Sequence, residues 1–207
     1  FGRLLEARRK RGTRLVVVDP RRTESAAAAD LHLQLAPGTD LYLLTAMLAV
    51  IVRDGVVDAE FVERHTTGFA LAAEHAKRLP LAEAARVTGV RAPDIERAAR
   101  LFARSPATLS LWCQGLNQSI HGADNGAALI HLHLATGQIA RPGAGPFSLT
   151  GQPNAMGGRE TGAMATLLPG HRDPADAADR AELARLWGID ALPATPGKTA
   201  VELFEAA

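Results

Sequence analysis

Apolar and polar positions along this chain are grouped in blocks that predict helices and short buried strands in turn. Residues 3–11 have a basic, helical composition, and Gly12 ends them. Thr13 to Asp19 (TRLVVVD) is a nearly continuous apolar run, with the length and β-branched content of a buried parallel strand. Residues 31–35 (LHLQL) alternate like a second short strand. This order predicts an α/β layer at the start of the chain.

The middle of the chain has the pattern of packed helices. Leu41 to Val52 is an apolar run of twelve residues, which is too short to cross a bilayer and typical of a buried helix that ends at Arg53. Gly68, Pro80 and Gly89 separate the segments that follow. These predicted helical segments are residues 58–65, 70–78, 81–87 and about 93–104, and we expect no chemistry in them.

A second buried strand is predicted at Pro106 to Cys113 (PATLSLWC), followed by the polar loop QGLNQSIHGADNG and a helix at about 127–136. Gly and Pro then recur every few residues. The run GQPNAMGGRETG at 151–162 has neither a helical nor a strand period, so it is predicted to be a loop. Helical segments return at about 174–187 and 197–206.

These elements predict an α/β fold, with Rossmann-like layers around a parallel sheet and many helices. We expect α/β cofactor-binding parts at about 1–40 and 105–162. Residues 41–104 are expected to be helical, and residues 163–207 to form an extension of helices and loops. The chain begins with Phe1 and a basic helix that lacks the apolar core of a signal peptide, so we expect it to be an internal part of a larger multidomain protein.

Charge and cysteine content exclude several functions. The 23 Lys and Arg residues balance 22 Asp and Glu residues, so no global field favours nucleic acid or an anionic membrane as a partner. The single Cys cannot form an internal disulfide, which favours a reducing compartment, with the cytoplasm as the default. Aromatic residues make up only 4% of this Ala-rich chain, a composition that favours helices packed through small side chains.

Four polar loops are candidates for ligand binding: DPRRT (19–23), PGTD (37–40), QGLNQS (114–119) and GQPNAMGGRE (151–160). Carboxylates at strand ends can accept hydrogen bonds from ribose or from a guanine edge, and Gly lets backbone N–H groups approach a pyrophosphate. The sequence contains neither a GxGxxG motif after a strand nor a P-loop. For the first two loops, nucleotide binding and ordinary turn or cap roles remain equally open.

The sequence supports a binding or catalytic role for some residues in or near these loops more strongly than for others. Arg159, among glycines, can bind a small anion through a charge-assisted contact; the alternative is an ion pair with Glu160 or a nearby carboxylate. Cys113 is more typical of a small buried residue than of a nucleophile. His131 and His133 are two apart in a predicted helix, so they face different sides and are expected to lie in the core or to support a site, rather than to share a metal.

Several motifs together, in this order and spacing, resemble the molybdopterin oxidoreductase family. They are RLVVVDPRRTESA, LAPGTD before an apolar helix, GLNQSIHGADN and HLATGQIARPGAGPFSLTGQPNAMGGRE. The resemblance covers essentially the whole chain. DPRRT and APGTD are shared by many members, whereas GPFSLTGQPNAMGGRE resembles the assimilatory nitrate reductase branch.

The resemblance implies a molybdenum centre held by two molybdopterin guanine dinucleotides. Carried over to this chain, the cofactor contacts fall on the first strand end, on the turn before the apolar helix and on the loop after the second strand. They are Asp19, Pro20, Arg21, Thr23, Gly38, Thr39, Asp40, Gln114, Gly115, Asn117 and Gln118. Periplasmic relatives have Met at the position of Gln114, so a sulfur contact is excluded there.

The same resemblance places Gln152 and Arg159 in the substrate funnel, although the periplasmic enzymes have one more residue between them. It implies two-electron reduction of nitrate to nitrite by oxygen-atom transfer to molybdenum. The ligands of a 4Fe–4S cluster and the Cys that ligates molybdenum are expected upstream of Phe1, so no metal ligand is assigned within this chain, and Cys113 does not match one. As an internal fragment, the chain is expected to be inactive alone.

The implied electron donor is a ferredoxin or an NADH-dependent flavoprotein. Two alternatives remain open at this stage. One is a formate dehydrogenase-like molybdoenzyme of the same family, and the other is a non-catalytic α/β module that binds a guanine nucleotide or a partner protein.

Overall fold

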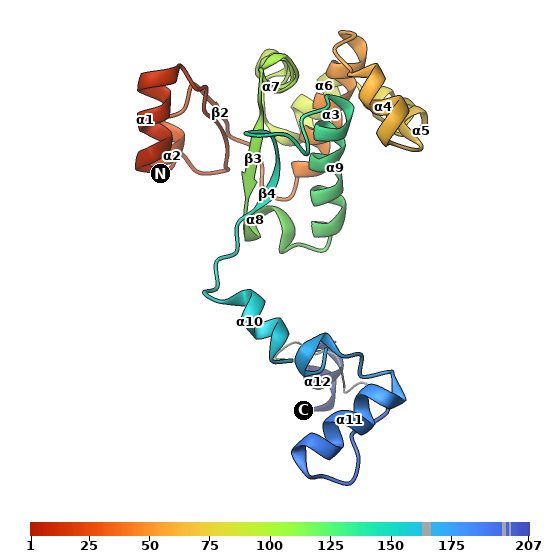
Figure 1. The fold of residues 1–207 in the computed structure, drawn as a ribbon. Coiled ribbons are helices and arrows are strands. Elements are labelled where there is room, and N and C mark those ends of the chain that lie inside the picture. Colours follow the sequence, from red (N-terminus) through yellow and green to blue (C-terminus); the bar gives the residue numbers. More distant parts are fainter. Residues whose placement is uncertain (163–166, 196–197, 199) are drawn as a thin grey trace. The chain divides into compact units, whose positions relative to one another are not determined.

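The computed structural model describes residues 1–162, 167–195, 198 and 200–207, and it divides into two compact units (Figure 1). The first unit is Phe1–Leu149 and the second is Thr150–Ala207.

The first unit begins with helix α1 (Gly2–Arg11), which ends where Gly12 adopts a left-handed φ of 68°. Strand β1 (Val16–Val18) then pairs in parallel with β2 (Leu31–Leu33), and the short helix α2 (Glu24–Ala27) connects them. This strand, helix, strand order forms a small parallel crossover unit, as the apolar pattern predicts.

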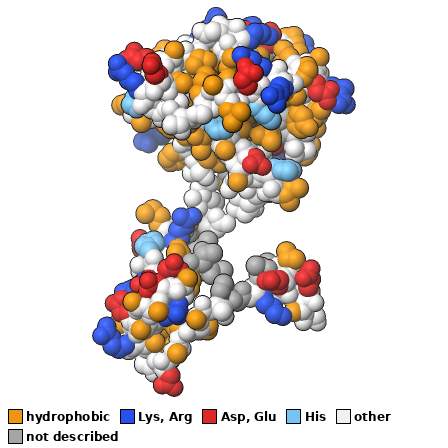
Figure 2. Space-filling view, turned by 90° about the vertical axis from the view of Figure 1, so that its right-hand side faces the viewer, with side chains coloured by type: hydrophobic (Ala, Val, Ile, Leu, Met, Phe, Trp, Pro, Cys, Tyr) orange, Lys and Arg blue, Asp and Glu red, His pale blue; other side chains and the backbone are white. Residues whose placement is uncertain are grey.

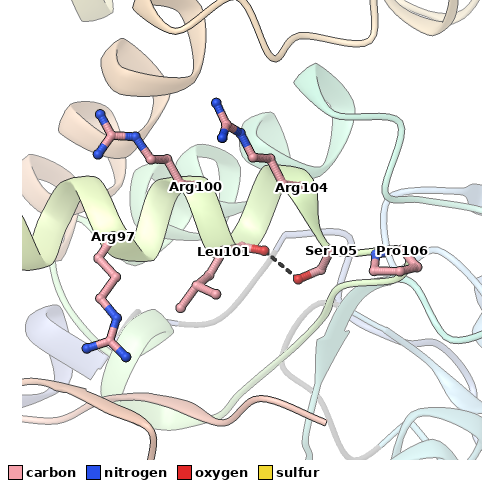
Figure 3. Close-up of a pocket in the computed structure, with 6 residues that line it drawn as sticks. All are labelled: Arg97, Arg100, Leu101, Arg104, Ser105 and Pro106. Atoms are coloured by element: carbon pink, nitrogen blue, oxygen red, sulfur yellow. Dashed lines mark hydrogen bonds between the residues drawn. The ribbon is translucent and has the colours of Figure 1, made fainter. Parts of the chain in front are cut away.

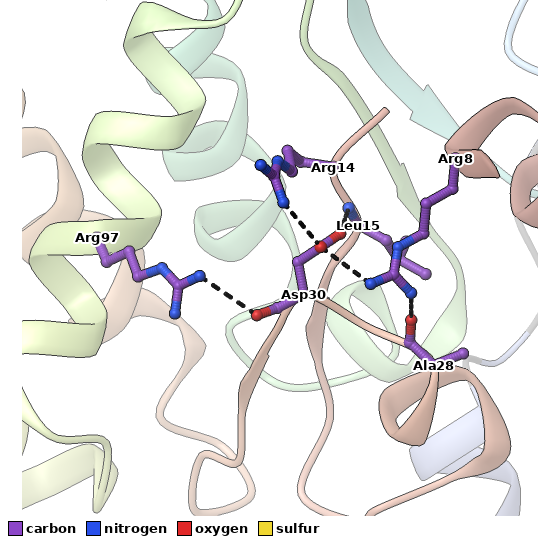
Figure 4. Close-up of polar contacts among 6 residues, drawn as sticks. All are labelled: Arg8, Arg14, Leu15, Ala28, Asp30 and Arg97. Carbon is purple, nitrogen blue, oxygen red and sulfur yellow. Dashed lines mark hydrogen bonds and ion pairs between the residues drawn. The ribbon is translucent and has the colours of Figure 1, made fainter. Parts of the chain in front are cut away.

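Asp30 attaches α1 and β1 to the residues that precede β2 (Figure 4). Its Oδ1 lies 2.9 Å from Arg8 Nη2 and 3.2 Å from Arg14 Nη1. Its Oδ2 accepts a hydrogen bond of 2.9 Å from the backbone N–H of Leu15. That N–H contact is the main reason why the pKa of Asp30 is lowered, and the two guanidiniums add to it.

Helix α3 (Asp40–Arg53) is the centre of the hydrophobic core and is buried along most of its length. It packs against helices on several sides because its apolar residues are not confined to one stripe. The helices packed against it are α5 (Phe69–Lys77), α6 (Leu81–Thr88), α7 (Ala92–Arg104) and α9 (Gly122–Ala135). Helix α4 (Ala59–His65) packs against α9.

A second parallel pair consists of β3 (Leu109–Trp112) and β4 (Gly145–Ser148), with Leu111 aligned with Phe147. The short helix α8 (Gln114–Asn117) follows β3 directly and leads to α9. Within the described residues, each of the two sheets therefore has two parallel strands.

The second unit contains α10 (Ala155–Glu160), a 3₁₀ turn η1 (Pro169–His171), α11 (Ala177–Trp187) and α12 (Ala200–Ala206). Asp176 caps α11, because its Oδ1 accepts from the N–H groups of Ala178 at 2.7 Å and Asp179 at 3.0 Å.

The structure confirms the α/β class with parallel strands and corrects details of the sequence prediction. Strands are three or four residues long, shorter than the apolar runs suggested. The prediction that 151–162 is a loop throughout was wrong. Residues 155–160 form α10, because Asn154 adopts a left-handed φ of 57° and its Oδ1 accepts from Gly157 N–H at 3.2 Å. Within the described part of the chain, we find no helix that combines the length and apolar character of a membrane span.

Candidate cofactor-binding loops

The DPRRT and APGTD loops leave the same edge of one sheet. Since β1 and β2 are neighbours and parallel, both loops follow the carboxyl ends of their strands. His32 Nε2 lies 2.9 Å from the backbone O of Asp19, and Gln34 Nε2 donates to the backbone O of Pro20 at 3.0 Å. These contacts bring the first predicted loop against the start of the second, at the strand edge where open α/β sheets bind ligands.

The DPRRT turn is held by its own side chains. Asp19 Oδ1 accepts from the backbone N–H of Arg21 at 2.7 Å, and Thr23 Oγ1 accepts from Ala26 N–H at 3.2 Å as the cap of α2. Arg21 itself is exposed, whereas Asp19 is half-buried. A carboxylate can accept several hydrogen bonds, so Asp19 retains capacity for a ligand donor.

The PGTD turn presents a glycine and a carboxylate at the start of the core helix α3. Gly38 has a φ of +79°, and the space where a Cβ would stand is open. Thr39 stands at the N-cap position of α3 without a side-chain cap bond, because its Oγ1 donates to the backbone O of Ala36 at 2.6 Å. Asp40 is in the first turn of α3, and burial raises its pKa while a bond from its own N–H acts in the opposite direction.

The third loop directly follows β3. Helix α8 contains Gln114, Gly115 and Asn117, and Gln118 follows its last residue. All four residues are exposed. Gly122, at the start of α9, lies so close to the carbonyl of Asn117 that a Cβ there would collide with that backbone group. The loop is therefore packed closely against α9, where Asn125 Nδ2 donates to the backbone O of Leu116 at 3.0 Å.

A buried polar network supports β3 on the side that faces α9. The ring of His133 is fully buried, with Nδ1 2.7 Å from the backbone O of Gln138 and Nε2 2.8 Å from Ser110 Oγ. Gln138, also buried, accepts from Thr108 N–H at 3.0 Å and donates to the backbone O of Ser105 at 2.8 Å. The sequence predicted a core or site-supporting position for both His131 and His133; His133 is buried, but His131 is exposed. This network was not predicted, because its members are up to 33 positions apart.

Gln152 and Arg159 lie in the second unit, so the structure defines no distance between them and the other three loops. Gln152 precedes α10 and Arg159 lies on it, and both are exposed. Among the described residues, no ion pair links Arg159 to Glu160 or to another carboxylate. The ion-pair alternative for Arg159 is therefore not observed.

Two surface hollows do not coincide with these loops. One, of about 450 Å³, lies along α7 and beside Ser105 and Pro106 (Figure 3). Its arginines do not converge, since Arg97 extends to the opposite side of α7 from Arg100 and Arg104. Arg100 is also paired with Asp54 Oδ2 at 2.7 Å. The other hollow, of about 640 Å³, lies between α3, α5 and α9.

The donor set of the first three loops fits a guanine nucleotide with phosphate groups. Asp19 and Asp40 have carboxylates, which are groups that can accept hydrogen bonds from ribose hydroxyls or a guanine N–H edge. Gly38 and Gly115 have open space on the side where a Cβ would stand, so their backbone is approachable. Cys113 is half-buried, and the described residues contain no cluster of three or more His, Cys, Asp or Glu side chains placed to hold a metal ion.

Comparison with known proteins finds nitrate reductases and a formate dehydrogenase among the relatives of this chain. The chain is 42% identical over 193 residues to a nitrate reductase of Synechocystis sp., covering 92% of this chain and 27% of that protein. It is 33% identical over 195 residues to formate dehydrogenase H of Escherichia coli, covering 94% of this chain and 27% of that protein. The chain thus spans about a quarter of the length of these relatives.

A solved structure agrees with this assignment. Acetylene hydratase from Pelobacter acetylenicus superimposes with a TM-score of 0.60 at 36% identity, over 67% of this chain and 19% of that one. The Molybdopterin oxidoreductase family description matches residues 2–207. This match covers nearly every residue and agrees with the parallel strand pairs and the loops at their ends. The chain therefore belongs to the molybdopterin oxidoreductase family.

Proposed function

We propose that this chain acts as part of a molybdenum enzyme that reduces nitrate to nitrite. The observation that carries the proposal is Arg159, an exposed cation without a carboxylate partner among the described residues, in a chain 42% identical to a nitrate reductase. A small planar anion with three oxygens suits a guanidinium, whose N–H donors form a planar fork.

The first three loops hold the cofactor in this proposal. Asp19 and Asp40 bind the guanosine ends, and backbone N–H groups near Gly38 and Gly115 bind phosphate oxygens. The remaining contacts are made by Pro20, Arg21, Thr23, Thr39, Gln114, Asn117 and Gln118. The group bound there is a molybdenum centre with two molybdopterin guanine dinucleotides, which supplies the two-electron redox chemistry.

Gln152 and Arg159 bind and orient the substrate. Arg159 attracts nitrate and neutralises its charge, while the Gln152 amide donates a second hydrogen bond that restricts its rotation. Reduction to nitrite consumes two electrons and two protons and releases water. In this proposal Arg159 serves as an anchor for the anion and does not supply those protons.

The other parts of the proposal concern the larger protein. A 4Fe–4S cluster passes electrons from a ferredoxin or an NADH-dependent flavoprotein, and the enzyme works in nitrate assimilation in the cytoplasm. The competing activity is formate oxidation, which the 33% identity to formate dehydrogenase H supports.

Substrate choice can be tested on the full-length protein purified from a host that makes the cofactor. Reduced viologen should be oxidised on addition of nitrate, with nitrite formed in a one-to-two ratio to the electrons consumed. Formate should fail to reduce an oxidised dye. Dye reduction by formate without nitrate turnover would reject nitrate as the substrate and keep the family chemistry.

A further inference from the structure

The direction of the Arg159 side chain is not fixed by a polar partner. Among the described residues, its guanidinium takes part in neither an ion pair nor a hydrogen bond. The residue is also exposed, so neighbouring atoms do not enclose it. The direction in which Arg159 points is therefore set by the backbone of α10, the helix on which it lies.

The overall charge of the second unit does not help Arg159 to attract an anion. Residues 150–207 contain five Lys and Arg residues against eight Asp and Glu residues. Basic and acidic side chains lie among hydrophobic ones on the face of this unit that Figure 2 shows. Because no broad positive field guides an anion to this unit, binding depends on how well Arg159 itself is placed.

Helix α10 has little stability of its own. It is only six residues long, and two of them, Gly157 and Gly158, disfavour a helix. None of its six residues is buried, so packing on a core contributes little to it. The contacts at its two ends must therefore keep it helical.

Asn154 supplies the contacts at the first end of α10. Its Oδ1 accepts from Gly157 N–H at 3.2 Å, and its backbone O accepts from Gly158 N–H at 3.0 Å. At the other end, Thr161 Oγ1 donates to the backbone O of Gly157 at 3.0 Å. Asn154 thus satisfies two of the N–H groups that the first turn of a helix leaves without a partner.

The residue types at positions 154 and 157 fit each other. Asn154 has a left-handed φ of 57°, which Asn and Asp adopt more readily than other residues with a Cβ. A Cβ at Gly157 would collide with the side-chain amide of Asn154, whereas the space at Gly158 is open. Gly157 therefore leaves room for the capping amide, and a larger residue there would displace it.

We propose that Asn154 and Gly157 are positioning residues for the substrate anchor Arg159. The amide of Asn154, seated against Gly157, holds the first turn of α10, and the helix then presents the guanidinium in the orientation that binds nitrate. Neither positioning residue needs to touch the substrate. This inference rests on the proposed function, in which Arg159 binds nitrate.

Hydrogen exchange in the full-length, cofactor-loaded protein measures the effect of the cap on α10. Asn154→Ala removes both the capping amide and a residue suited to the left-handed backbone, so exchange at Gly158 and Thr161 should accelerate about tenfold or more. Asn154→Asp keeps both properties and should exchange like the parent. Unchanged exchange in Asn154→Ala would overturn the proposal.

The affinity of Arg159 for nitrate can be measured without turnover. Phenylglyoxal modifies arginine side chains, and nitrate bound to the oxidised protein should protect Arg159, with peptide mass spectrometry assigning the label. The nitrate concentration that gives half protection should rise about tenfold in Asn154→Ala. Arg185, exposed on α11, is the internal control and should react equally at all nitrate concentrations.

Steady-state kinetics separate a positioning role from a general loss of folded enzyme. The KM for nitrate should rise about tenfold in Asn154→Ala, with kcat per bound molybdenum close to that of the parent. A variant that merely folds less well would lose active enzyme and keep its KM. Such a result, with half protection of Arg159 also unchanged, would overturn the proposal.

A double substitution tests the fit between the two positions. Gly157→Ala displaces the amide of Asn154, so half protection should require about tenfold more nitrate than in the parent. Asn154→Gly lacks the amide, and in that background Gly157→Ala should change the value less than about twofold. Gly158→Ala is the matched control and should not accelerate exchange of α10. Equal effects of Gly157→Ala in both backgrounds would contradict the proposed fit.

Nitrite formation and molybdenum content are measured on the same preparations. If the parent forms no nitrite but nitrate protects Arg159 in a way that depends on Asn154, the positioning role stands and the proposed reduction is rejected. If the parent forms nitrite and the Asn154 variants share its KM and its half protection, the reverse holds. Failure of nitrate to protect Arg159 in the parent would overturn the positioning role itself.

Discussion

His133 Nε2 lies 2.8 Å from Ser110 Oγ, and this contact joins α9 to β3 immediately before the loop assigned to the cofactor. The carbonyl of Gln138, 2.7 Å from Nδ1, can only accept, so Nδ1 carries the proton and Nε2 accepts from the Ser110 hydroxyl. One buried imidazole thereby links α9 to the strand that leads into this loop.

Replacement of His133 tests this support. His133→Leu keeps an apolar side chain in the space but leaves the Ser110 hydroxyl and the Gln138 carbonyl without their partner. The free energy of local opening should fall by about 2 kcal/mol, and amide exchange across β3 should accelerate roughly 30-fold. The measurement is hydrogen exchange on the full-length protein, with Ser110→Ala expected to have a smaller effect. Unchanged exchange in β3 would show that the bond carries no such support.

The same residue predicts a pH dependence. Burial is the main cause that lowers the pKa of His133 in the folded state, against a smaller effect of its bond to Gln138. The unfolded state therefore binds more protons than the folded state between the folded pKa and the ordinary value of 6.5. Stability is fully present above that value and is lost as the pH falls below it.

Exchange protection factors for β3 and α9, measured at pH 7.5 and pH 5.5, check this sign. The parent protein should lose protection at the lower pH. A His133→Gln variant should lose less, because its amide does not titrate. An equal loss in both proteins would assign the effect to other groups.

Two glycines of α9 form a matched pair for testing the cofactor loop. A Cβ at Gly122 would collide with the Asn117 carbonyl, whereas the space around Gly126 is open. Gly122→Ala should displace the loop and lower the bound guanine nucleotide several-fold. Gly126→Ala should retain it and stabilise the helix by about 1 kcal/mol. The bound nucleotide is released by acid and measured by chromatography. Equal nucleotide content in the two variants would show that Gly122 does not affect the binding site.

Thr23 is predicted to act both as the α2 cap and at the cofactor. Thr23→Ala should destabilise α2 by about 1 kcal/mol, since the bond to Ala26 N–H is lost. Thr23→Ser retains a hydroxyl and should restore both the cap and the nucleotide content. Exchange at Ala26 reports the cap and nucleotide analysis reports the contact. A loss of capping with full nucleotide content would restrict Thr23 to a structural role.

Arg159 is the substrate anchor in this account. Arg159→Ala should lower kcat/KM for nitrate about 10- to 100-fold through loss of a charge-assisted contact, with molybdenum content unchanged. Arg159→Lys should recover part of it, because a lysine keeps the charge but not the planar fork. Arg185→Ala, at an exposed position of α11, is the control and should behave like the parent. Viologen-linked steady-state kinetics measure all three.

Sequence patterns predicted the elements well where local signals are strong. The run around α3 and the segments bounded by Gly68, Pro80 and Gly89 appear as helices within one or two residues of their expected ends. Helix α10 was missed because its capping depends on the left-handed backbone of Asn154 rather than on an apolar period.

The candidate site was predictable to a different extent in each part. Strand ends indicated the DPRRT and APGTD loops, and the parallel pairing of β1 with β2 brings them together. The hydroxyl of Thr39 bonds the preceding Ala36 carbonyl, and the sequence could not predict this, because a hydroxyl at this position can equally bond a helix N–H. The His133 network depends on contacts distant in sequence, which no local pattern contains.

The central claim is that this chain helps to hold a molybdenum centre that reduces nitrate. The most direct measurement is nitrite formation by the full-length protein, together with its molybdenum and guanine nucleotide content. We predict nitrite formation, with about two guanine nucleotides for each molybdenum. Protein that is folded, made in a cofactor-competent host and still free of both molybdenum and guanine nucleotide would contradict the account.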